Sequence, residues 1–291
     1  MRIQKILVTG ANGQLGWELS QAAKVTPNFE FIFLDRNAMD LSIPIDLENI
    51  VLLYAPYAII NTAAYTAVDK AETETNLAHT INAEAVAELA SIAKNKNIPF
   101  ITYSTDYVFS GNATSPYTTD TPLAPVNFYG QTKADGELMA LAANPDAIII
   151  RTSWVFSSHG NNFVKTMIRL MTERDSLNIV GDQKGRPTYA KDLAFITIKI
   201  LSAINDGASI KGIYHYANTG ATTWFDFAQK IKELAGFDCQ LTAINSDQFP
   251  TPAKRPAYSV LDTQKIEKEL NLDIPHWEFA LSDCILQLKN N

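Results

Sequence analysis

The sequence contains little cysteine and little histidine, which narrows the chemistry that the protein can carry. Two cysteines (Cys239 and Cys284) and four histidines occur in 291 residues. The cysteines are far apart in apolar surroundings, which favours buried free thiols over a disulfide. The histidines form no i,i+4 pair and lie near no cysteine. We therefore predict no metal site.

The chain also lacks an excess of positive charge and a long apolar run. Its 31 acidic residues outnumber 24 basic ones, for a formal net charge of -7, which disfavours nucleic acid as a partner. No apolar run approaches the roughly 18 to 20 residues that a membrane span needs. The first residues lead directly into a strand-like segment without a signal-peptide pattern. We expect a cytoplasmic globular protein that binds neither nucleic acid nor membrane.

Apolar segments of strand length alternate with amphipathic helical segments in the first half of the chain. The predicted strands are 5–9, 29–34, 58–61, 98–103 and 147–151, and the longer predicted helices are 76–96 and 131–143. Strands that are apolar throughout belong inside a parallel sheet covered by helices on both faces. This pattern predicts an α/β fold with a doubly wound parallel sheet, the Rossmann architecture.

After about residue 156 the elements become shorter and prolines more frequent. We predict a dinucleotide-binding domain over 1–156 and a smaller, mainly substrate-binding α/β domain over 157–291. Helix 190–204 is the one element of the second part expected to be able to pack back on the first. Thr222 or Thr223 is the expected N-cap of the helix that ends near 235.

A glycine-rich turn follows the first strand and opens a helix. The spacing Gly10-x-x-Gly13-x-x-Gly16 is a variant of the dinucleotide fingerprint, widened by one residue between the first two glycines. Glycines there permit a tight turn and let backbone N–H groups approach a pyrophosphate at the helix N-terminus. The residues expected at this part of the cofactor are Gly10, Asn12, Gly13, Gln14, Leu15 and Gly16.

The ends of the next strands are expected to contact the rest of the dinucleotide. Asp35 closes the second strand, where a carboxylate accepts from the ribose hydroxyls of NAD. Arg36 can instead meet the 2'-phosphate of NADP or stack on adenine, so NADH and NADPH both remain open. Asp40 and Leu41 are expected beside the adenine. Small and polar residues at the third strand end are expected near the diphosphate and nicotinamide ribose, and they are Ala63, Ala64, Tyr65 and Thr66.

A tyrosine and a lysine one helical turn apart follow a strand that ends in hydroxyl-bearing residues. Tyr129 and Lys133 fall on one helix face. A lysine ammonium and an oxidised nicotinamide nearby favour the phenolate, so Tyr129 is expected to exchange a proton with a substrate oxygen as hydride is transferred. Lys133 is also expected to hydrogen-bond the nicotinamide ribose, and Thr105 to polarise the same carbonyl. Tyr103, on the same strand as Thr105, is placed with the cofactor residues.

Several longer motifs resemble the extended short-chain dehydrogenase/reductases, and more narrowly the dTDP-4-dehydrorhamnose reductases. They are GQLGWEL at 13–19, NTAAYTAVDKAE at 61–72, YSTDYVF at 103–109, YGQTK at 129–133, RTSWVF at 151–156, GNNF at 160–163 and PTPAKRP at 250–256. They span nearly the whole chain.

The resemblance implies NADPH- or NADH-dependent reduction of the 4-keto group of dTDP-4-dehydro-6-deoxy-L-mannose (dTDP-6-deoxy-L-lyxo-4-hexulose) to dTDP-L-rhamnose. Tyr129 would be the proton donor, Lys133 its ribose-bound partner and Thr105 the hydroxyl that tunes it. The implied sugar-nucleotide contacts are Thr105, Asp106 and Trp154, whose indole offers a flat apolar face to a 6-deoxy sugar. Tyr107 is a substrate contact or a packed aromatic, and Arg255 a diphosphate contact or a structural arginine.

One position departs from the family pattern. Some members are thought to dimerise through a metal held by glutamates, and Glu18 matches one such position, but Lys191 stands at another. A cation in place of a carboxylate repels a metal. We expect a monomer, with a homodimer as the alternative.

Two other functions remain open at this point. A sugar-nucleotide epimerase or dehydratase of the same superfamily would keep its cofactor and show no net consumption of NAD(P)H. A catalytically silent dinucleotide-binding regulatory subunit would need neither Tyr129 nor Lys133.

Overall fold

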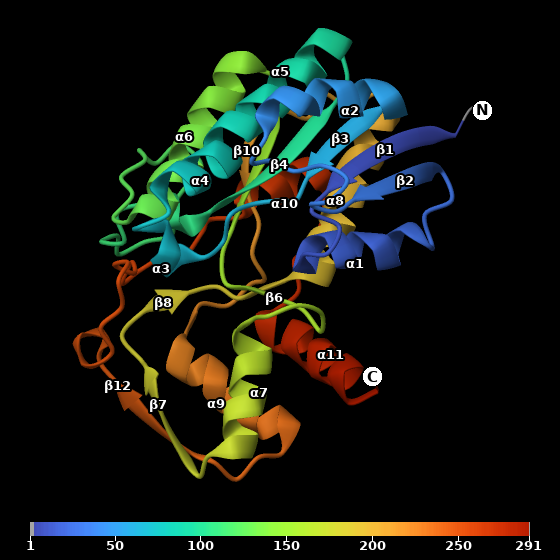
Figure 1. Ribbon diagram of the computed structural model, residues 1–291. Coiled ribbons are helices and arrows are strands. Elements are labelled where there is room, and N and C mark those ends of the chain that lie inside the picture. Colours follow the sequence, from blue (N-terminus) through green and yellow to red (C-terminus); the bar gives the residue numbers. More distant parts are fainter. Residues whose placement is uncertain (1–2, 291) are drawn as a thin grey trace.

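The computed structural model describes residues 3–290, whose central feature is a six-stranded sheet (Figure 1). The strand order is β10-β5-β4-β3-β1-β2, and every neighbouring pair is parallel. The strands are β1 (Gln4–Thr9), β2 (Phe29–Leu34), β3 (Ala58–Asn61), β4 (Phe100–Thr105), β5 (Ile148–Thr152) and β10 (Gly212–His215). The predicted α/β fold with a doubly wound parallel sheet is confirmed.

Helices cover both faces of this sheet, as its apolar strands require. One face carries α2 (Leu47–Tyr54), α5 (Ala85–Lys96) and α6 (Phe128–Ala143), and the other α1 (Gln14–Ala23), α8 (Ala190–Asn205) and α10 (Gln264–Leu270). All four residues of β3 are buried. Each such aliphatic side chain contributes about 1.5 to 3 kcal/mol through burial. Two separate cores therefore hold the strand ends in register.

The helical segment before β4 differs from the expected single helix over 76–96. It consists of α4 (Thr75–His79), a π-helical turn (Thr80–Glu84) and α5. Asn82, within the π turn, accepts a hydrogen bond from Tyr65 N at 2.9 Å and donates one to Tyr65 O at 3.0 Å. The π turn thus points an amide at the loop after β3, a local irregularity often found at functional sites.

A smaller body lies below the sheet in Figure 1. It contains α7 (Phe163–Glu173), α9 (Trp224–Ala235), α11 (Trp277–Asn290) and the parallel pair β7 (Ser176–Val180) and β12 (Gln240–Ile244). Its core includes Phe156, Phe227 and Trp277. Thr223 caps α9 by accepting from Asp226 N at 3.1 Å. It is one of the two residues expected to cap this helix.

Two elements of the second half join the larger body. Helix α8 packs against α1, and β10 pairs with β5 at the edge of the main sheet. The remaining short strands are β6 (Val155–Phe156), β8 (Lys184–Gly185), β9 (Thr188–Tyr189) and β11 (Thr222–Thr223). The division of the chain near residue 156 stays a prediction.

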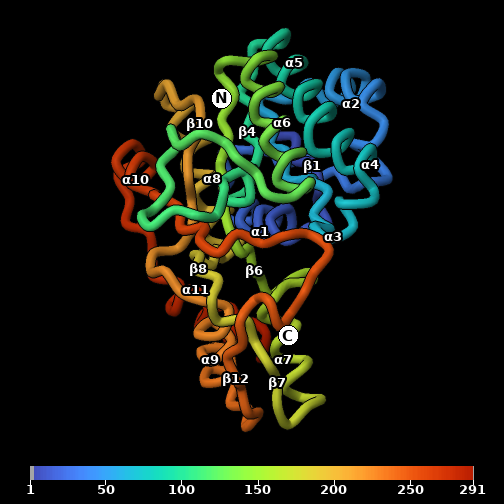
Figure 2. The backbone as a smooth tube through the Cα atoms, turned by 90° about the vertical axis from the view of Figure 1, so that its left-hand side faces the viewer, coloured from blue at the N-terminus to red at the C-terminus, as the bar shows by residue number. Residues whose placement is uncertain are grey.

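Residues 250–256, which we call the proline strap, return from the smaller body past α3 (Val68–Ala71), as the orange-red segment in Figure 2 shows. Ala253 N donates to Asp69 Oδ1 at 3.1 Å. Asn127 Nδ2 donates to Lys254 O at 2.7 Å. The strap therefore connects the loop after β3 with the start of α6.

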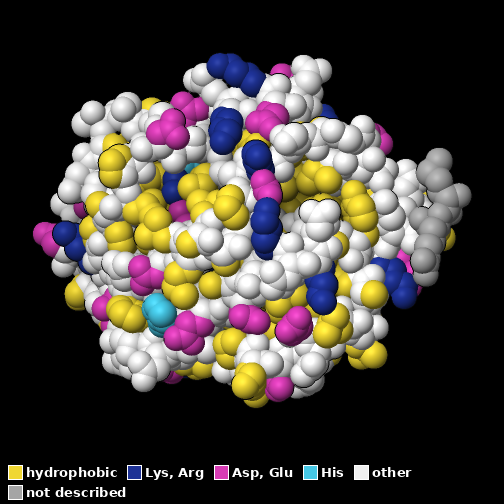
Figure 3. Space-filling model, turned by 90° about the horizontal axis from the view of Figure 1, so that it is seen from above, with side chains coloured by type: hydrophobic (Ala, Val, Ile, Leu, Met, Phe, Trp, Pro, Cys, Tyr) yellow, Lys and Arg dark blue, Asp and Glu magenta, His cyan; other side chains and the backbone are white. Residues whose placement is uncertain are grey.

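The surface carries charges of both signs. On the face seen in Figure 3, acidic and basic side chains are interspersed with hydrophobic ones, and no continuous basic patch covers this face. Within residues 3–290, no helix has the length and apolar character needed to cross a membrane. Cys239 and Cys284 are both buried free thiols, as expected.

Candidate functional site

A cavity of about 830 Å³ lies at the carboxyl ends of the parallel strands, where ligands bind in open α/β sheets. Most of the predicted cofactor residues line it: Gly10, Asn12, Gly13, Gln14, Leu15, Arg36, Asp40, Leu41, Ala63, Ala64, Tyr65, Thr66, Tyr103, Tyr129 and Lys133. Gly16 and Asp35 are not among the lining residues. The cavity joins the glycine turn at one end to Tyr129 at the other.

The glycine turn fits the diphosphate of a dinucleotide. Gly10 has φ +72°, and a Cβ there would lie 2.7 Å from Ala63 N. A Cβ at Gly16 would lie 2.3 Å from Gly10 O, so this glycine brings α1 against the turn. Gly13 stands at the N-cap of α1 without a side-chain cap, and a Cβ there would meet Gly10 O alone, at 3.3 Å. The free N-terminal amides of α1 are therefore left for an anion.

The part of the site expected to bind adenosine carries both acidic and basic side chains. Asp35 Oδ1 accepts from the backbone N–H groups of Asn37 and Ala38 at 3.0 and 3.1 Å. Arg36 is 70% exposed, and its Nε donates to Asp40 Oδ2 at 3.2 Å. Both the carboxylate expected for ribose and the guanidinium expected for a 2'-phosphate lie at the end of β2. Their contacts with a cofactor stay predictions.

Helix α6 begins three residues earlier than the sequence suggested, at Phe128. Asn127 caps it by accepting from Gly130 N at 2.7 Å, and Glu72 accepts from Phe128 N at 2.9 Å. Tyr129 therefore lies in the first helical turn, one turn before Lys133. The Lys133 ammonium donates to the Tyr103 carbonyl at 2.7 Å. The cap and the β4 carbonyl fix the two predicted catalytic side chains relative to the sheet.

The pKa of Tyr129 moves in the direction opposite to the one expected from Lys133. Burial raises the pKa of its phenol to about 12, the Thr105 hydroxyl opposes that shift, and the Asp106 charge adds to it. The phenolate expected beside an oxidised nicotinamide stays a prediction, and by itself the protein keeps the phenol protonated at neutral pH. A protonated phenol is the form that can donate to a carbonyl oxygen.

Lys133 is buried with little to balance its charge. Desolvation lowers the pKa of its ammonium to about 8, and the carboxylate of Glu137 opposes this shift. Lysine titrates near 10.5 in an open chain. Perturbations of this size are common in active sites, where a cation is held for a ligand.

Thr105 and Asp106 lie directly beside Tyr129. Thr105 Oγ donates to Asp106 Oδ1 at 3.0 Å, and its hydroxyl opposes the rise in the pKa of Tyr129. Burial raises the pKa of Asp106 to about 6, against the hydroxyls of Ser259 and Thr105. Within the described chain, Asp106 Oδ2 has no hydrogen-bond partner. A buried acceptor left open in this way suits a donor on a ligand.

Tyr107 and Arg255 are linked to each other and to Asp69. The Tyr107 ring meets the Tyr129 ring edge-on, with centroids 5.8 Å apart, and Tyr107 is one of the groups that raise the pKa of Arg255. The Arg255 guanidinium forms a two-pronged pair with the Asp69 carboxylate, with Nη2 to Oδ2 at 2.8 Å. This pairing favours the structural role for Arg255 that the sequence left open, because its fork is already engaged.

Trp154 lies between β5 and β6, where the chain passes into the smaller body. Its indole stacks on Trp224 with ring centroids 3.6 Å apart. The structure thus brings Thr105, Asp106, Tyr107, Tyr129 and Lys133 together. Trp154 is not among the residues that line the cavity.

Some residues at the site were not singled out from the sequence. Gly160 and Asn161 line the cavity, and Asn162 donates to Gln14 Oε1 at 2.9 Å. They belong to the Gly-Asn-Asn-Phe motif, whose presence was the available signal. Ser259 and Asp69 had no local signal, because their partners are distant in the sequence.

No metal-binding group was found among residues 3–290, taking three or more His, Cys, Asp or Glu side chains as the requirement. Glu18 is buried and accepts from Ser157 Oγ at 2.6 Å. Lys191 pairs instead with Asp283 at 2.8 Å. The expectation of no bridging metal stays a prediction, and the Lys191 pairing supports it.

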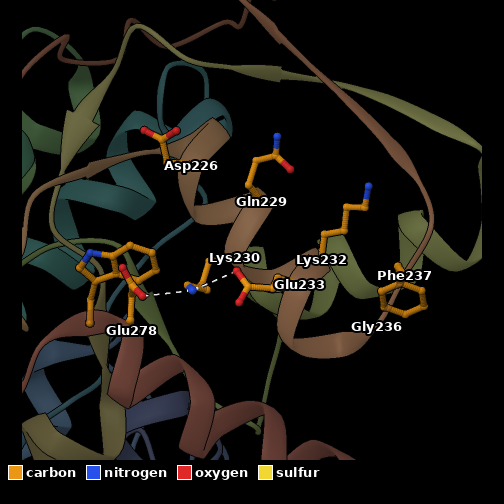
Figure 4. A pocket seen from close by; sticks show the side chains of 9 residues that line it. Asp226, Gln229, Lys230, Lys232, Glu233, Gly236, Phe237 and Glu278 are labelled. Carbon is orange, nitrogen blue, oxygen red and sulfur yellow. Dashed lines mark hydrogen bonds and ion pairs between the residues drawn. The ribbon is translucent and has the colours of Figure 1, made fainter.

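A second hollow, of about 440 Å³, lies on the smaller body between α9 and α11 (Figure 4). Lys230 lies between Glu233 and Glu278, at 2.9 and 3.2 Å. Asp226, Gln229 and Lys232 point away from this pair in Figure 4. Because its central cation is already neutralised, we assign no function to this hollow.

Known proteins match this chain over nearly its full length. Residues 4–290 match the family described as RmlD substrate binding domain. A dTDP-4-dehydrorhamnose reductase from Burkholderia thailandensis is 40% identical over 98% of this chain and 99% of its own.

Two solved structures give the same result. A dTDP-4-dehydrorhamnose reductase from Clostridium acetobutylicum has a TM-score of 0.92 and 39% identity, over 98% of this chain and 99% of its own. A dTDP-4-dehydrorhamnose reductase from Bacillus anthracis, in complex with NADP, has a TM-score of 0.93 and 35% identity over the same shares.

Proposed function

Because the chain belongs to the RmlD family of dTDP-4-dehydrorhamnose reductases, we propose that it reduces dTDP-4-dehydro-6-deoxy-L-mannose at C4 to dTDP-L-rhamnose, with NADPH or NADH as cofactor. The observation that carries the mechanism is the protonated Tyr129 at the end of the dinucleotide cavity, beside Thr105 and one turn before Lys133. The NADP complex of the Bacillus anthracis relative supports the cofactor.

The chain's own residues provide proton transfer and orientation. Bound NADPH or NADH supplies the hydride. The Tyr129 phenol donates its proton to the C4 oxygen, and the Thr105 hydroxyl, which opposes the rise in the pKa of that phenol, orients it. As the phenolate forms, the Lys133 ammonium stabilises the negative charge.

We assign substrate binding to a polar group without a hydrogen-bond partner and to aromatic side chains near Tyr129. Asp106 Oδ2 is a buried acceptor without a partner in the described chain, so it can accept from a sugar hydroxyl. Trp154 supplies an apolar face, and Tyr107 forms the wall behind Tyr129. We assign Arg255 to the proline strap and not to the diphosphate, since Asp69 already engages it.

The test is loss of absorbance at 340 nm with the dTDP-keto sugar and each cofactor in turn. We expect consumption by the wild-type protein and a loss of about 10² to 10⁴-fold in Tyr129→Phe. Thr118→Ser, which changes an exposed hydroxyl residue outside the cavity, is the control. Consumption that Tyr129→Phe leaves unchanged would reject Tyr129 as the acid.

The same assay separates the other two functions. An epimerase or dehydratase would convert the sugar without net consumption of cofactor, and a regulatory subunit would convert nothing. The reductase names of the relatives and the intact Tyr129, Lys133 and Thr105 favour the reductase. A cytoplasmic location stays a prediction.

We also propose that the protein is a monomer. The Lys191 ammonium, paired with Asp283 near Glu18, disfavours a bridging metal at this position. The mass in solution should equal that of one 32.1 kDa chain, with or without a chelator. A mass that a chelator halves would contradict this proposal.

A further inference from the structure

Trp154 and Trp224 form a stacked pair of indoles, with ring planes only 10° apart. Trp224 is the first residue of α9, and its other neighbours are Phe163 at 4.6 Å and Phe227 at 6.4 Å between centroids. Both indoles remain partly exposed. The α9 helix and its aromatic neighbours thus support Trp154 from behind.

The backbone of Trp154 is held in an uncommon conformation. Its φ is +48°, in the left-handed region that residues other than glycine seldom adopt. Thr188 N donates to Trp154 O at 3.2 Å, and Ser153 Oγ donates to Arg186 O at 2.6 Å. Such a conformation persists where surrounding contacts over-determine it, and it is concentrated at functional sites. The direction of the indole is therefore set by both backbone and stacking.

Gly185 lies between this indole and the hydroxyl of Ser259. A Cβ at Gly185 would lie 2.6 Å from Trp154 Cε2 and 2.9 Å from Ser259 Oγ. The ring edge and the serine therefore lie against the same point of β8. Ser259 lies beside Asp106 and opposes the rise in the pKa of its carboxyl, and Asp106 Oδ1 accepts from the Thr105 hydroxyl. Only a residue without a side chain fits between the indole and this network.

We propose that Trp224 is a positioning residue that holds Trp154 as a rigid platform, and that this platform determines which face of the C4 carbonyl receives hydride. The inference rests on the proposed reductase function. A flat apolar surface packs against the deoxygenated side of the sugar, while Asp106 and Tyr129 hold its polar side. In either orientation C4 gains a hydride and its oxygen a proton, so a sugar bound with the opposite face of its carbonyl toward the nicotinamide yields the C4 epimer of the product.

The readout is the ratio of the two C4 epimers, measured by NMR together with kcat and KM. We expect Trp224→Ala to raise the fraction of C4 epimer and to lower kcat/KM for the sugar by about 10 to 100-fold, with the cofactor KM unchanged. Trp224→Phe should restore most of both, because a phenyl ring can still stack on Trp154. Trp277→Phe is the matched control. It alters a tryptophan of the same core that packs on Phe227, and should leave the epimer ratio unchanged.

A second variant tests the platform from its other side. Gly185→Ala should push the Trp154 ring away from Ser259 and also raise the C4 epimer fraction. Gly181→Ala, whose added carbon would meet Ala243 Cβ at 3.3 Å, is the control and should be silent. If Trp224→Ala does not fold, Trp224→Leu, which keeps an apolar side chain but has no ring to stack on Trp154, takes its place, and with Gly185→Ala it still decides the matter.

A single epimer and an unchanged sugar KM in folded Gly185→Ala and in folded Trp224→Ala would overturn the inference while leaving the reductase function intact. Where the alanine variant does not fold, the same result in folded Trp224→Leu and in folded Gly185→Ala would overturn it. Absence of keto-sugar reduction by the wild-type protein would overturn both.

Discussion

Lys133 and Arg151 are two cations buried against helix α6, and they are held differently. Arg151 and its partner Glu137 are each 2% exposed, and their groups meet at 2.6 to 2.9 Å in a two-pronged pair. Arg151 also donates to the Thr119 carbonyl and lies 5.0 Å from the Phe109 ring centre. Lys133, one turn earlier than Glu137, donates to a single carbonyl, that of Tyr103.

The difference separates a structural cation from a reactive one. Arg151 is well compensated, and its neighbour His215 is neutral because burial, and after it the Arg151 charge, lowers the pKa of that imidazole to about 3. Lys133 instead has a pKa lowered to about 8, chiefly by desolvation. Because Glu137 is committed to Arg151, it gives Lys133 little compensation. A helix can therefore bury two positive charges and leave just one of them available to a ligand.

Lys133→Met should separate the effect on activity from the effect on stability most clearly. We expect activity to fall by about 10² to 10⁴-fold, because the charge beside Tyr129 is lost. The free energy of unfolding should not fall, because an apolar side chain replaces a desolvated ammonium. Reductase assays and denaturant unfolding measure the two effects. Lys96→Met, at an exposed site on α5, is the control, and a loss of stability in Lys133→Met without loss of activity would reverse the assignment.

Arg151→Met should show the opposite behaviour. Removing one partner of a buried pair leaves the Glu137 charge uncompensated, which costs about 3 to 5 kcal/mol in unfolding free energy. Turnover per folded molecule should remain. Arg169→Met, which breaks an exposed pair with Glu173, should change stability by less than about 1 kcal/mol. An equal loss in the two variants would show that burial of the Arg151 pair is not what matters.

The smallest expected effect is on the pH dependence of the free energy of unfolding. Between pH 8 and 10.5 the unfolded chain, with lysine near 10.5, binds more protons than the folded protein, in which the pKa of Lys133 is about 8. Stability from this group therefore rises with pH across that window. The buried tyrosines act above pH 10, so unfolding should be measured from pH 8 to 9.5. The slope should be less positive in Lys133→Met, and parallel slopes would contradict the shifted pKa.

The cofactor side of the site was largely predictable from the sequence. The turn Gly10 to Gly16 and the pair Tyr129 and Lys133 are defined within a few residues, so spacing alone predicted their arrangement. The N-terminus of α6 was placed too late, because its cap Asn127 follows a loop without periodicity. The rise in the pKa of Tyr129 had no signal in the sequence, because desolvation is a property of the folded environment.

The substrate side was less predictable. Arg255 left two interpretations open until the structure placed it against Asp69, 186 residues away in sequence. Ser259 carried no local signal, yet it touches the Asp106 network from the smaller body. The support of Trp154 by Trp224 depends on how α9 packs on the strand junction, which no short pattern records.

By itself, the sequence determined the alternation of strands and helices, the dinucleotide turn, and the order of hydroxyl, tyrosine and lysine, because these depend on periodicity and spacing over a few residues. The tertiary structure alone decided which cation is compensated, which carboxylate oxygen stays open beside Tyr129, and what supports Trp154. These depend on desolvation and on contacts between segments far apart in the chain, and such contacts exist only once the two bodies have packed together.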